Sequence, residues 1–303
     1  MRRLQAESPF DVVHFWDVHF AFAYRGAYVA SLHHSFRERL GTMDRDSMPG
    51  VSCALRHVYY SLARALAEAQ AVRRARGLLA ISATTRVRFA QEYGIALDSI
   101  ALVRHGIDLG YFRPSPATSL RARLEIQEGE PVILFVGFVT PRKGLAYLAR
   151  ALPLMRPVPR LILAGRWSRG YRRQFYGLLG PVRERVIEAG FVPDEEMPAY
   201  YSLADVYVSA SLLEGFGLPL AESLACGTPV VAANTGATAE VVGPGGVLVP
   251  ARDPQALADA VSLLLGDPER RLRLGELGRQ HVSSQFSLEA MLRDTLAAYQ
   301  RFS

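Results

Sequence analysis

The sequence has 303 residues, of which 50% are hydrophobic and 21% charged, a composition that supports a globular protein with one large core or two modest ones. No apolar run approaches the roughly 20 residues of a membrane-spanning helix, and the N-terminus lacks the apolar stretch of a secretory signal. The two cysteines, Cys53 and Cys226, are far apart and lack a metal-ligand spacing, which argues against a disulfide framework and a zinc site. We therefore expect a cytoplasmic protein.

The formal net charge of +6 suits an anionic partner, whether nucleic acid, an acidic membrane face or a phosphorylated small molecule. The basic residues form short groups without the interleaved aromatic residues of a nucleic-acid platform. We expect no nucleic acid as a partner. Peripheral contact with the inner face of a membrane stays open.

In chain order, short β-rich runs alternate with longer helical ones, which predicts parallel sheets covered by helices. The first half has expected helices at 55–74 and 84–93, the second capped by Ser82. Its expected strands are 11–15, 27–32, 77–81 and 99–104. The second half has expected strands at 131–137, 160–164, 186–189, 205–209, 229–232 and 246–249.

The glycines and prolines of residues 105–116 predict a linker between the two halves. We expect an N-terminal domain over 1–114 and a C-terminal domain over 115–287. The last helix, within 288–303, is expected to pack back toward the first domain.

The most informative segment reads Ser-Leu-Leu-Glu-Gly-Phe-Gly-Leu-Pro and follows an expected buried strand. Gly215 and Gly217 leave its backbone open to a ligand. Leu218 then begins a helix, whose free N–H groups and positive dipole end suit a diphosphate. Glu214 in the loop and Glu222 one turn into the helix are expected to border the same pocket and to accept hydrogen bonds from sugar or ribose hydroxyls. The alternative interpretation is an ordinary loop and a solvated helix face.

This segment resembles the Glu-x7-Glu signature of the retaining glycosyltransferase family 4, whose members have the GT-B fold. The resemblance covers essentially the whole second half. It implies that Glu222 holds the ribose of a nucleotide-diphosphate sugar and that Glu214 lies beside the donor sugar. The intervening amides, including that of Phe216, would meet the sugar and the phosphates.

A second match surrounds the expected strand that ends at Gly137. It resembles the family's phosphate-binding turn, with Lys143 at the position of the family's lysine. Phe138 takes the place of the family's arginine, and we expect the neighbouring Arg142 to supply that charge. Cations here would stabilise the departing diphosphate. An exposed lysine at a helix start is the alternative interpretation.

The resemblance also implies that backbone groups near Val192 read the edge of the nucleobase. It implies no cofactor besides the nucleotide-sugar co-substrate, and no metal. Asp44 and Asp46 spell the short acidic motif of metal-dependent transferases, but they lie in a polar loop instead of following a buried strand. We expect no metal there.

The first half resembles the family more thinly. His33 follows an expected strand where family members carry a histidine beside the donor sugar, and a structural histidine is the alternative. His105 stands where the family usually has asparagine. The family's opening strand, its glycine-rich loop and the next strand-helix unit have no counterpart before Asp11. Either the start lies upstream or the acceptor side is incomplete.

These features predict an α/β, GT-B-like fold with two Rossmann-like domains facing a cleft, the first incomplete. The expected activity is a retaining, metal-independent hexosyl transfer to a hydroxyl of a saccharide, lipid or small molecule, in cell-surface glycan or glycolipid synthesis. The expected catalytic residues are His33, Lys143 and Glu214. A catalytically impaired nucleotide-sugar-binding protein and a same-fold epimerase or hydrolase are the alternatives. The sequence identifies neither the donor nor the acceptor.

Overall fold

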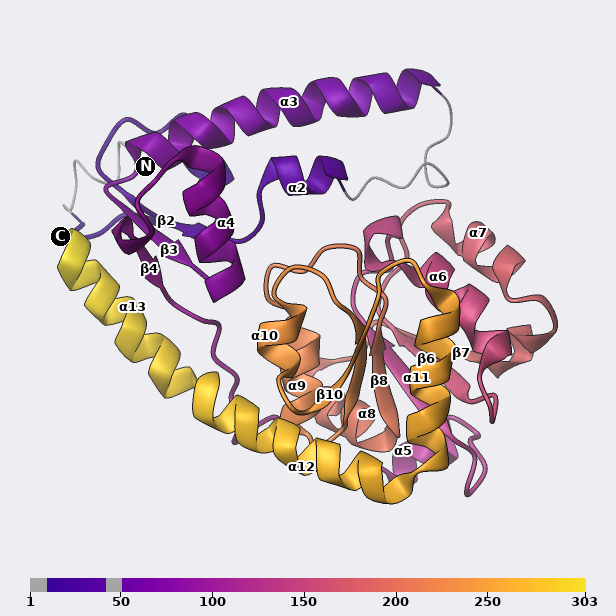
Figure 1. The fold of residues 1–303 in the computed structure, drawn as a ribbon. Helices are drawn as coiled ribbons and strands as arrows, with labels where there is room; N and C mark the ends of the chain where they lie inside the picture. The colour runs from indigo at the N-terminus through magenta and orange to yellow at the C-terminus, as the bar shows by residue number, and fades with distance from the viewer. Residues whose placement is uncertain (1–9, 42–50) are drawn as a thin grey trace. The chain divides into compact units, whose positions relative to one another are not determined.

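The computed structural model describes residues 10–41 and 51–303, which divide into two compact units (Figure 1). Unit 1 contains the described residues up to Gly106 together with Glu289–Ser303, and unit 2 is Ile107–Leu288. Each unit contains one parallel sheet. Asp44 and Asp46, considered above for metal binding, lie outside the described residues.

Unit 1 is built on a four-stranded sheet in the order β1-β2-β3-β4. Its strands are β1 (His14–Phe15), β2 (Val29–Leu32), β3 (Gly77–Ala80) and β4 (Ile100–Leu102). Its helical segments are η1 (Val18–Ala21), α2 (Phe36–Gly41), α3 (Val51–Arg74), α4 (Ala83–Tyr93), η3 (Leu97–Ser99) and α13 (Leu288–Phe302).

Side chains of the unit 1 strands alternate between two apolar clusters, as the period of a strand requires. Ala30 and Leu32 pack into one cluster with Phe89 of α4. Val29 packs on the opposite face with Ala298 of α13. Both faces of this sheet are therefore covered within unit 1.

Unit 2 is built on a six-stranded parallel sheet in the order β10-β9-β8-β5-β6-β7. Its strands are β5 (Val132–Val136), β6 (Arg160–Ala164), β7 (Val186–Gly190), β8 (Val206–Ser209), β9 (Val230–Ala233) and β10 (Gly246–Val249). The chain starts in the middle with β5, adds β6 and β7 on one side, and then adds β8, β9 and β10 on the other. This is the doubly wound order of dinucleotide-binding folds, and it reverses between β5 and β8.

Two layers of helices cover the unit 2 sheet (Figure 1). One layer contains α6 (Leu145–Ala151), α7 (Tyr171–Leu178) and α11 (Pro254–Gly266), and the other contains α5 (Thr118–Arg123), α8 (Met197–Leu203), α9 (Leu218–Ala225) and α12 (Pro268–Gln285). Shorter segments are η4 (Pro141–Lys143), η5 (Leu152–Leu154), η6 (Gly180–Arg185), η7 (Asp194–Glu196) and α10 (Thr238–Val242). β8 and β9 are buried throughout and β5 is buried up to Phe135, which explains why the sequences of these strands are mostly apolar.

The α/β fold expected from the sequence is confirmed, with both sheets parallel. Ser82 caps α4 as expected, because its hydroxyl accepts a hydrogen bond from the Thr85 amide at 3.0 Å. The first strand is shorter than expected, since only His14–Phe15 pair with a neighbour, β2.

Candidate functional site

The site in unit 2 lies where the strand order reverses. β5 and β8 are neighbours through the pairs Ile133↔Val206 and Leu134↔Tyr207. The loops that leave their carboxyl ends run in opposite directions and open a crevice where ligands bind in folds of this type. Both segments singled out in the sequence, 137–144 and 211–218, are these two loops.

An ion pair joins the two loops. Nζ of Lys143 lies 2.6 Å from Oε1 of Glu214, with the two side chains 15% and 10% exposed. Lys143 ends η4, and Gly144 follows in the left-handed conformation with φ 67°. A Cβ at Gly144 would overlap the carbonyl oxygen of Ala210, so the close approach of the loops requires glycine. Lys143 is also the only lysine in the sequence.

The N-terminus of α9 lies beside this ion pair. Gly217 precedes α9 with φ 93°, and Pro219 occupies the first turn, where its missing N–H has no cost. A Cβ on Gly217 would lie 3.9 Å from Cγ of Glu214. The positive end of the helix and the ammonium of Lys143 therefore border the same carboxylate.

The residues around Gly217 differ in exposure. Phe216 is buried, and its ring packs edge-on against Phe286 at a centroid distance of 5.2 Å. Leu218 is exposed and Gly215 is half-buried. Because the Phe216 side chain is buried against Phe286, it anchors the loop, and only the backbone of Phe216 is suited to contact a ligand.

Glu222 is held by a buried tyrosine. The Tyr201 hydroxyl donates to Oε2 of Glu222 at 2.5 Å. Burial raises the pKa of Glu222, although this hydrogen bond acts against the shift. Burial also raises the pKa of Tyr207 well above its ordinary value, and Glu214 and then Glu222 add to the shift. Both carboxylates therefore act electrostatically on Tyr207, whose strand borders the point where the strand order reverses.

Gly137 and Arg142 lie in the same loop as Lys143. A Cβ at Gly137 would lie 4.0 Å from Cε of Lys143, so the lysine side chain passes directly by this glycine. Arg142 donates from its guanidinium to the Leu213 carbonyl at 2.7 Å, and its own carbonyl accepts from the Leu212 amide at 2.9 Å. Arg142 thus ties the two loops together.

Val192 follows β7 and is buried. Its neighbour Phe191 is 64% exposed, and the Arg166 guanidinium lies over the Phe191 ring at 4.9 Å. Arg166 follows β6, and the Gly165 amide donates to the Gly190 carbonyl at 2.6 Å. A flat, cationic surface therefore stands beside the segment that the sequence associated with the nucleobase.

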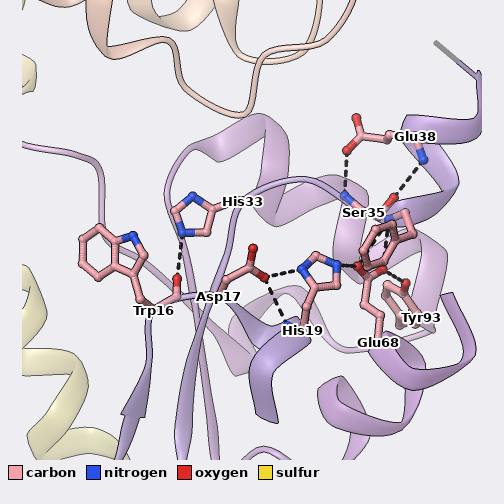
Figure 2. A network of polar contacts seen from close by, with 9 residues as sticks. Trp16, Asp17, His19, His33, Ser35, Glu38, Glu68 and Tyr93 are labelled. Atoms are coloured by element: carbon pink, nitrogen blue, oxygen red, sulfur yellow. Dashed lines mark hydrogen bonds and ion pairs between the residues drawn. The ribbon is translucent and has the colours of Figure 1, made fainter. Parts of the chain in front are cut away.

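In unit 1, His33 directly follows β2, and its Nε2 donates to the Trp16 carbonyl at 2.7 Å (Figure 2). The structure brings Gly137, Lys143, Glu214 and Gly217 together in unit 2, and Glu222 lies further along α9 with Tyr201 as its partner. His33 belongs to unit 1 and has its own set of neighbours.

A second polar network in unit 1 centres on His19, whose ring is hydrogen-bonded to Asp17 and to the fully buried Glu68 (Figure 2). Glu68 also accepts from the Tyr93 hydroxyl and from the Phe36 amide. Burial alone would lower the pKa of His19, but the hydrogen bonds to the two carboxylates outweigh it and raise the pKa. This network ties η1, α2, α3 and α4 together.

Sequence reasoning missed four contributors to these sites. In the sequence, Tyr201 and Tyr207 cannot be distinguished from ordinary aromatic residues of a core. Arg166 and Phe191 belong to no recognisable motif. Within 10–41 and 51–303, no three or more His, Cys, Asp or Glu side chains group as a metal site, and no helix there is long and apolar enough to cross a membrane.

Two family models match the chain. The model described as "Glycosyl transferases group 1" matches residues 117–281, and the model described as "Glycosyltransferase Family 4" matches residues 1–111. The chain therefore belongs to the group 1, family 4 glycosyltransferases. The family expected from the sequence, with its GT-B-like fold, is confirmed.

Relatives agree with this assignment. The chain is 36% identical over 248 residues to a D-inositol 3-phosphate glycosyltransferase of Xylanimonas cellulosilytica, covering 78% of this chain and 59% of that protein. It is 34% identical over 232 residues to a GDP-mannose-dependent alpha-(1-6)-phosphatidylinositol monomannoside mannosyltransferase of Mycobacterium tuberculosis, covering 72% and 58%. The chain spans less than two thirds of the length of these relatives.

Among solved structures, the sucrose-phosphate synthase of Thermosynechococcus elongatus superposes with a TM-score of 0.83 at 26% identity. The match covers 99% of this chain and 75% of that protein. The similarity therefore extends over both units.

Proposed function

We propose that this protein transfers a sugar from a nucleotide-diphosphate sugar to an acceptor hydroxyl, with retention of configuration and without a metal. The observation that carries the proposal is the Lys143–Glu214 ion pair beside the N-terminus of α9. An ammonium has three donors, and the pair with Glu214 uses one of them. The others, with the helix amides, suit the oxygens of a diphosphate.

In this proposal, Lys143 and the amides around Gly217 stabilise the negative charge that develops on the leaving diphosphate. That is the role a divalent cation has in other transferases. Glu214 accepts a hydrogen bond from a hydroxyl of the donor sugar and orients Lys143. Arg142 contributes indirectly, because its guanidinium donates a hydrogen bond to the Leu213 carbonyl and so positions the loop that contains Glu214.

The ribose and the base occupy the other side of the diphosphate. Glu222 accepts hydrogen bonds from the ribose hydroxyls, and its bond from Tyr201 occupies only part of the roughly four acceptor positions of a carboxylate. The base lies at the backbone of Val192, against the exposed ring of Phe191 and the Arg166 guanidinium.

The names of the relatives suggest the first substrates to test. One is named for D-inositol 3-phosphate and the other for GDP-mannose and a phosphatidylinositol mannoside. We therefore propose GDP- and UDP-hexoses as donors and an inositol- or mannose-containing acceptor, free or lipid-linked.

The test is calorimetry with GDP, UDP and ADP, followed by turnover of the matching radiolabelled hexose donors with and without acceptor. Binding of one nucleotide and transfer to the acceptor support the proposal. Binding without turnover assigns the chain to a nucleotide-sugar-binding role, and turnover without acceptor assigns it to hydrolysis or epimerisation. Absence of nucleotide binding overturns the proposal.

A further inference from the structure

A basic hollow is formed by α7 and the segment that follows it, η6. α7 lies at the outer side of unit 2, beside α6 (Figure 1). The hollow has a volume of about 700 Å³ and is called the α7 hollow below. Its lining consists of glycine, arginine and tyrosine residues: Gly170, Arg172, Arg173, Tyr176, Gly177 and Arg183. None of these belongs to the site that contains Lys143 and Glu214.

Positive charge is concentrated around the α7 hollow. Residues 166–188 contain six arginines and two glutamates, which give this segment a net charge of +4, out of +6 for the whole chain. The arginines are Arg166, Arg169, Arg172, Arg173, Arg183 and Arg185, and the glutamates are Glu184 and Glu188. Among the residues that the structure describes, none that lines the hollow has a carboxylate. Like charges that share a hollow repel one another, and an anionic ligand would remove that repulsion.

Two of the lining arginines are held over one aromatic ring. The guanidinium carbon of Arg172 lies 5.2 Å from the centroid of the Tyr176 ring, and that of Arg183 lies 5.0 Å from it. The attraction between a guanidinium and a ring face uses none of the five N–H donors of an arginine. The Tyr176 ring therefore positions both cations and leaves them able to donate to another group.

Glu188 fixes one side of the hollow. It accepts hydrogen bonds from the Tyr176 hydroxyl, from Nε of Arg172 at 2.9 Å and from Nε1 of Trp167 at 3.0 Å. The charge of Glu188 is thus compensated by Arg172. In the described ranges 10–41 and 51–303, no carboxylate pairs with Arg173 or Arg183. Tyr176 and Arg172 are held in place before a ligand arrives, and two further guanidiniums keep their full charge.

Gly177 leaves one side of the hollow without a side chain. It lies within α7, where glycine is less favourable than alanine. A Cβ at Gly177 would meet no atom within 4 Å. Packing therefore does not require glycine at this position, and the effect of the glycine is to keep the hollow open.

We propose that the α7 hollow binds a phosphate group through the guanidiniums of Arg172, Arg173 and Arg183. A guanidinium presents parallel N–H groups that match two oxygens of a phosphate. A soluble phosphate ester and the headgroup of an anionic lipid offer the same contact, and the two arms of the experiment distinguish them. This binding is independent of the proposed function, because it involves neither Lys143 nor Glu214.

Calorimetry with inorganic phosphate tests the soluble ligand, in a Lys143→Ala background that removes the cation of the proposed donor site. Arg183→Gln is expected to weaken phosphate binding at least about tenfold, because a charge-assisted hydrogen bond is lost. Arg273→Gln is the matched control, since Arg273 is exposed and lines another hollow together with Asp267 and Glu269. Equal losses in the two variants would show a general effect of charge and overturn the inference.

Sedimentation with vesicles tests the lipid headgroup. We expect the wild type to bind vesicles of equal parts phosphatidylcholine and phosphatidylglycerol, and not vesicles of phosphatidylcholine alone. Arg183→Gln should lower this affinity about fivefold, because each basic residue at an anionic surface contributes a comparable amount. Phosphate binding without vesicle binding identifies a soluble ester as the ligand, and vesicle binding identifies the lipid headgroup.

Variants of Gly177 test the hollow itself without removing an arginine. Gly177→Glu places a carboxylate among the guanidiniums and is expected to abolish binding in both arms. Gly177→Ala is its control and should bind as the wild type does, since a Cβ has open space there. Undiminished binding in Gly177→Glu overturns the inference, as does absence of binding to both phosphate and anionic vesicles.

Fluorescence offers a local readout, because Trp16 and Trp167 are the only tryptophans in the sequence. The ring centroid of Trp167 lies 6.2 Å from that of Tyr176. In a Trp16→Phe, Lys143→Ala variant, the bound probe is expected to shift Trp167 emission, and addition of Gly177→Glu should remove the shift. A shift that persists with Gly177→Glu would place the phosphate elsewhere.

Discussion

Nζ of Lys143 and Oε1 of Glu214 lie 2.6 Å apart although the two residues are 71 positions apart in the sequence. The ion pair closes the point where the strand order of unit 2 reverses, and both side chains are largely shielded from water. Each partner compensates the charge of the other until a ligand arrives.

Replacement of Lys143 is expected to damage the proposed transfer reaction severely. Lys143→Ala removes the cation that would meet the leaving diphosphate, so we expect kcat to fall about 10²- to 10³-fold. Lys143→Arg keeps the charge but not the compact ammonium, and should recover only part of the rate. Steady-state kinetics with the donor identified by calorimetry provides the measurement. A near-normal kcat in Lys143→Ala would remove the lysine from the mechanism.

The single lysine also permits a direct binding assay. Reductive methylation with ¹³C-formaldehyde labels only Lys143 and the N-terminal amine, because the sequence contains no other lysine. A nucleoside diphosphate is expected to shift the Lys143 methyl resonance, and the corresponding nucleoside should not, because it lacks the phosphates. Equal shifts with both ligands would contradict a phosphate contact. Lys143→Arg identifies the resonance.

Glu222 is expected to recognise the ribose hydroxyls. A hydrogen bond to a charged group contributes about 1.5–3 kcal/mol, so the wild type should bind a ribonucleoside diphosphate at least about tenfold more tightly than its 2′,3′-dideoxy analogue. Glu222→Ala removes the acceptor, and calorimetry should show that this preference is lost. A preference that survives in Glu222→Ala would place the ribose elsewhere.

Gly144 is expected to tolerate no side chain. Its φ of 67° is unfavourable for other residues, and a Cβ would also overlap the Ala210 carbonyl. We expect Gly144→Ala to lower the unfolding midpoint and to weaken nucleotide binding, since the Lys143 loop must move. Gly129→Ala is the matched control, because Gly129 has a φ of 75° with open space around it. Gly129→Ala should lower the free energy of unfolding by about 1–2 kcal/mol and leave nucleotide binding unchanged.

The His19 network is expected to make unit 1 less stable at high pH. The pKa of His19 is raised above its ordinary 6.5 in the folded state, so its contribution is complete below pH 6.5 and is lost as pH rises through the folded value. The stability difference between wild type and His19→Gln should therefore shrink with rising pH. Thermal unfolding followed by Trp16 fluorescence in the Trp167→Phe background measures it. A stability difference between wild type and His19→Gln that stays constant as pH rises above 6.5 would contradict the expected titration of His19.

Glu68 is expected to be the most sensitive residue of this network. It is fully buried and accepts from the His19 ring, the Tyr93 hydroxyl and the Phe36 amide. Glu68→Ala leaves these donors without their acceptor and should destabilise the protein by about 3–5 kcal/mol in denaturant unfolding. Tyr93→Phe removes a single hydrogen bond and should cost about 1 kcal/mol. Similar costs for the two changes would show that Glu68 is not the centre of the network.

Much of the fold follows from local patterns in the sequence. The strands expected at 160–164 and 246–249 coincide with β6 and β10 to the residue. β6 is buried after Arg160 and therefore needs a continuous apolar run, whereas β10 is a half-buried edge strand. Ser82 was recognisable as a cap since its hydroxyl acts on an amide only three residues away. The expected length of β1 was too great, because an apolar run does not show how many of its residues pair with a neighbouring strand.

The sequence by itself determined the alternation of strands and helices, the segment with Glu214 and Glu222, and the presence of one lysine in the turn after β5. These are short-range properties, encoded by side-chain polarity and by glycine and proline. Only the tertiary structure decided that Lys143 pairs with Glu214, that Tyr201 supports Glu222, and that Trp16 meets His33 and His105. Such contacts depend on strand order, which arises from packing of the whole sheet and not from any single segment.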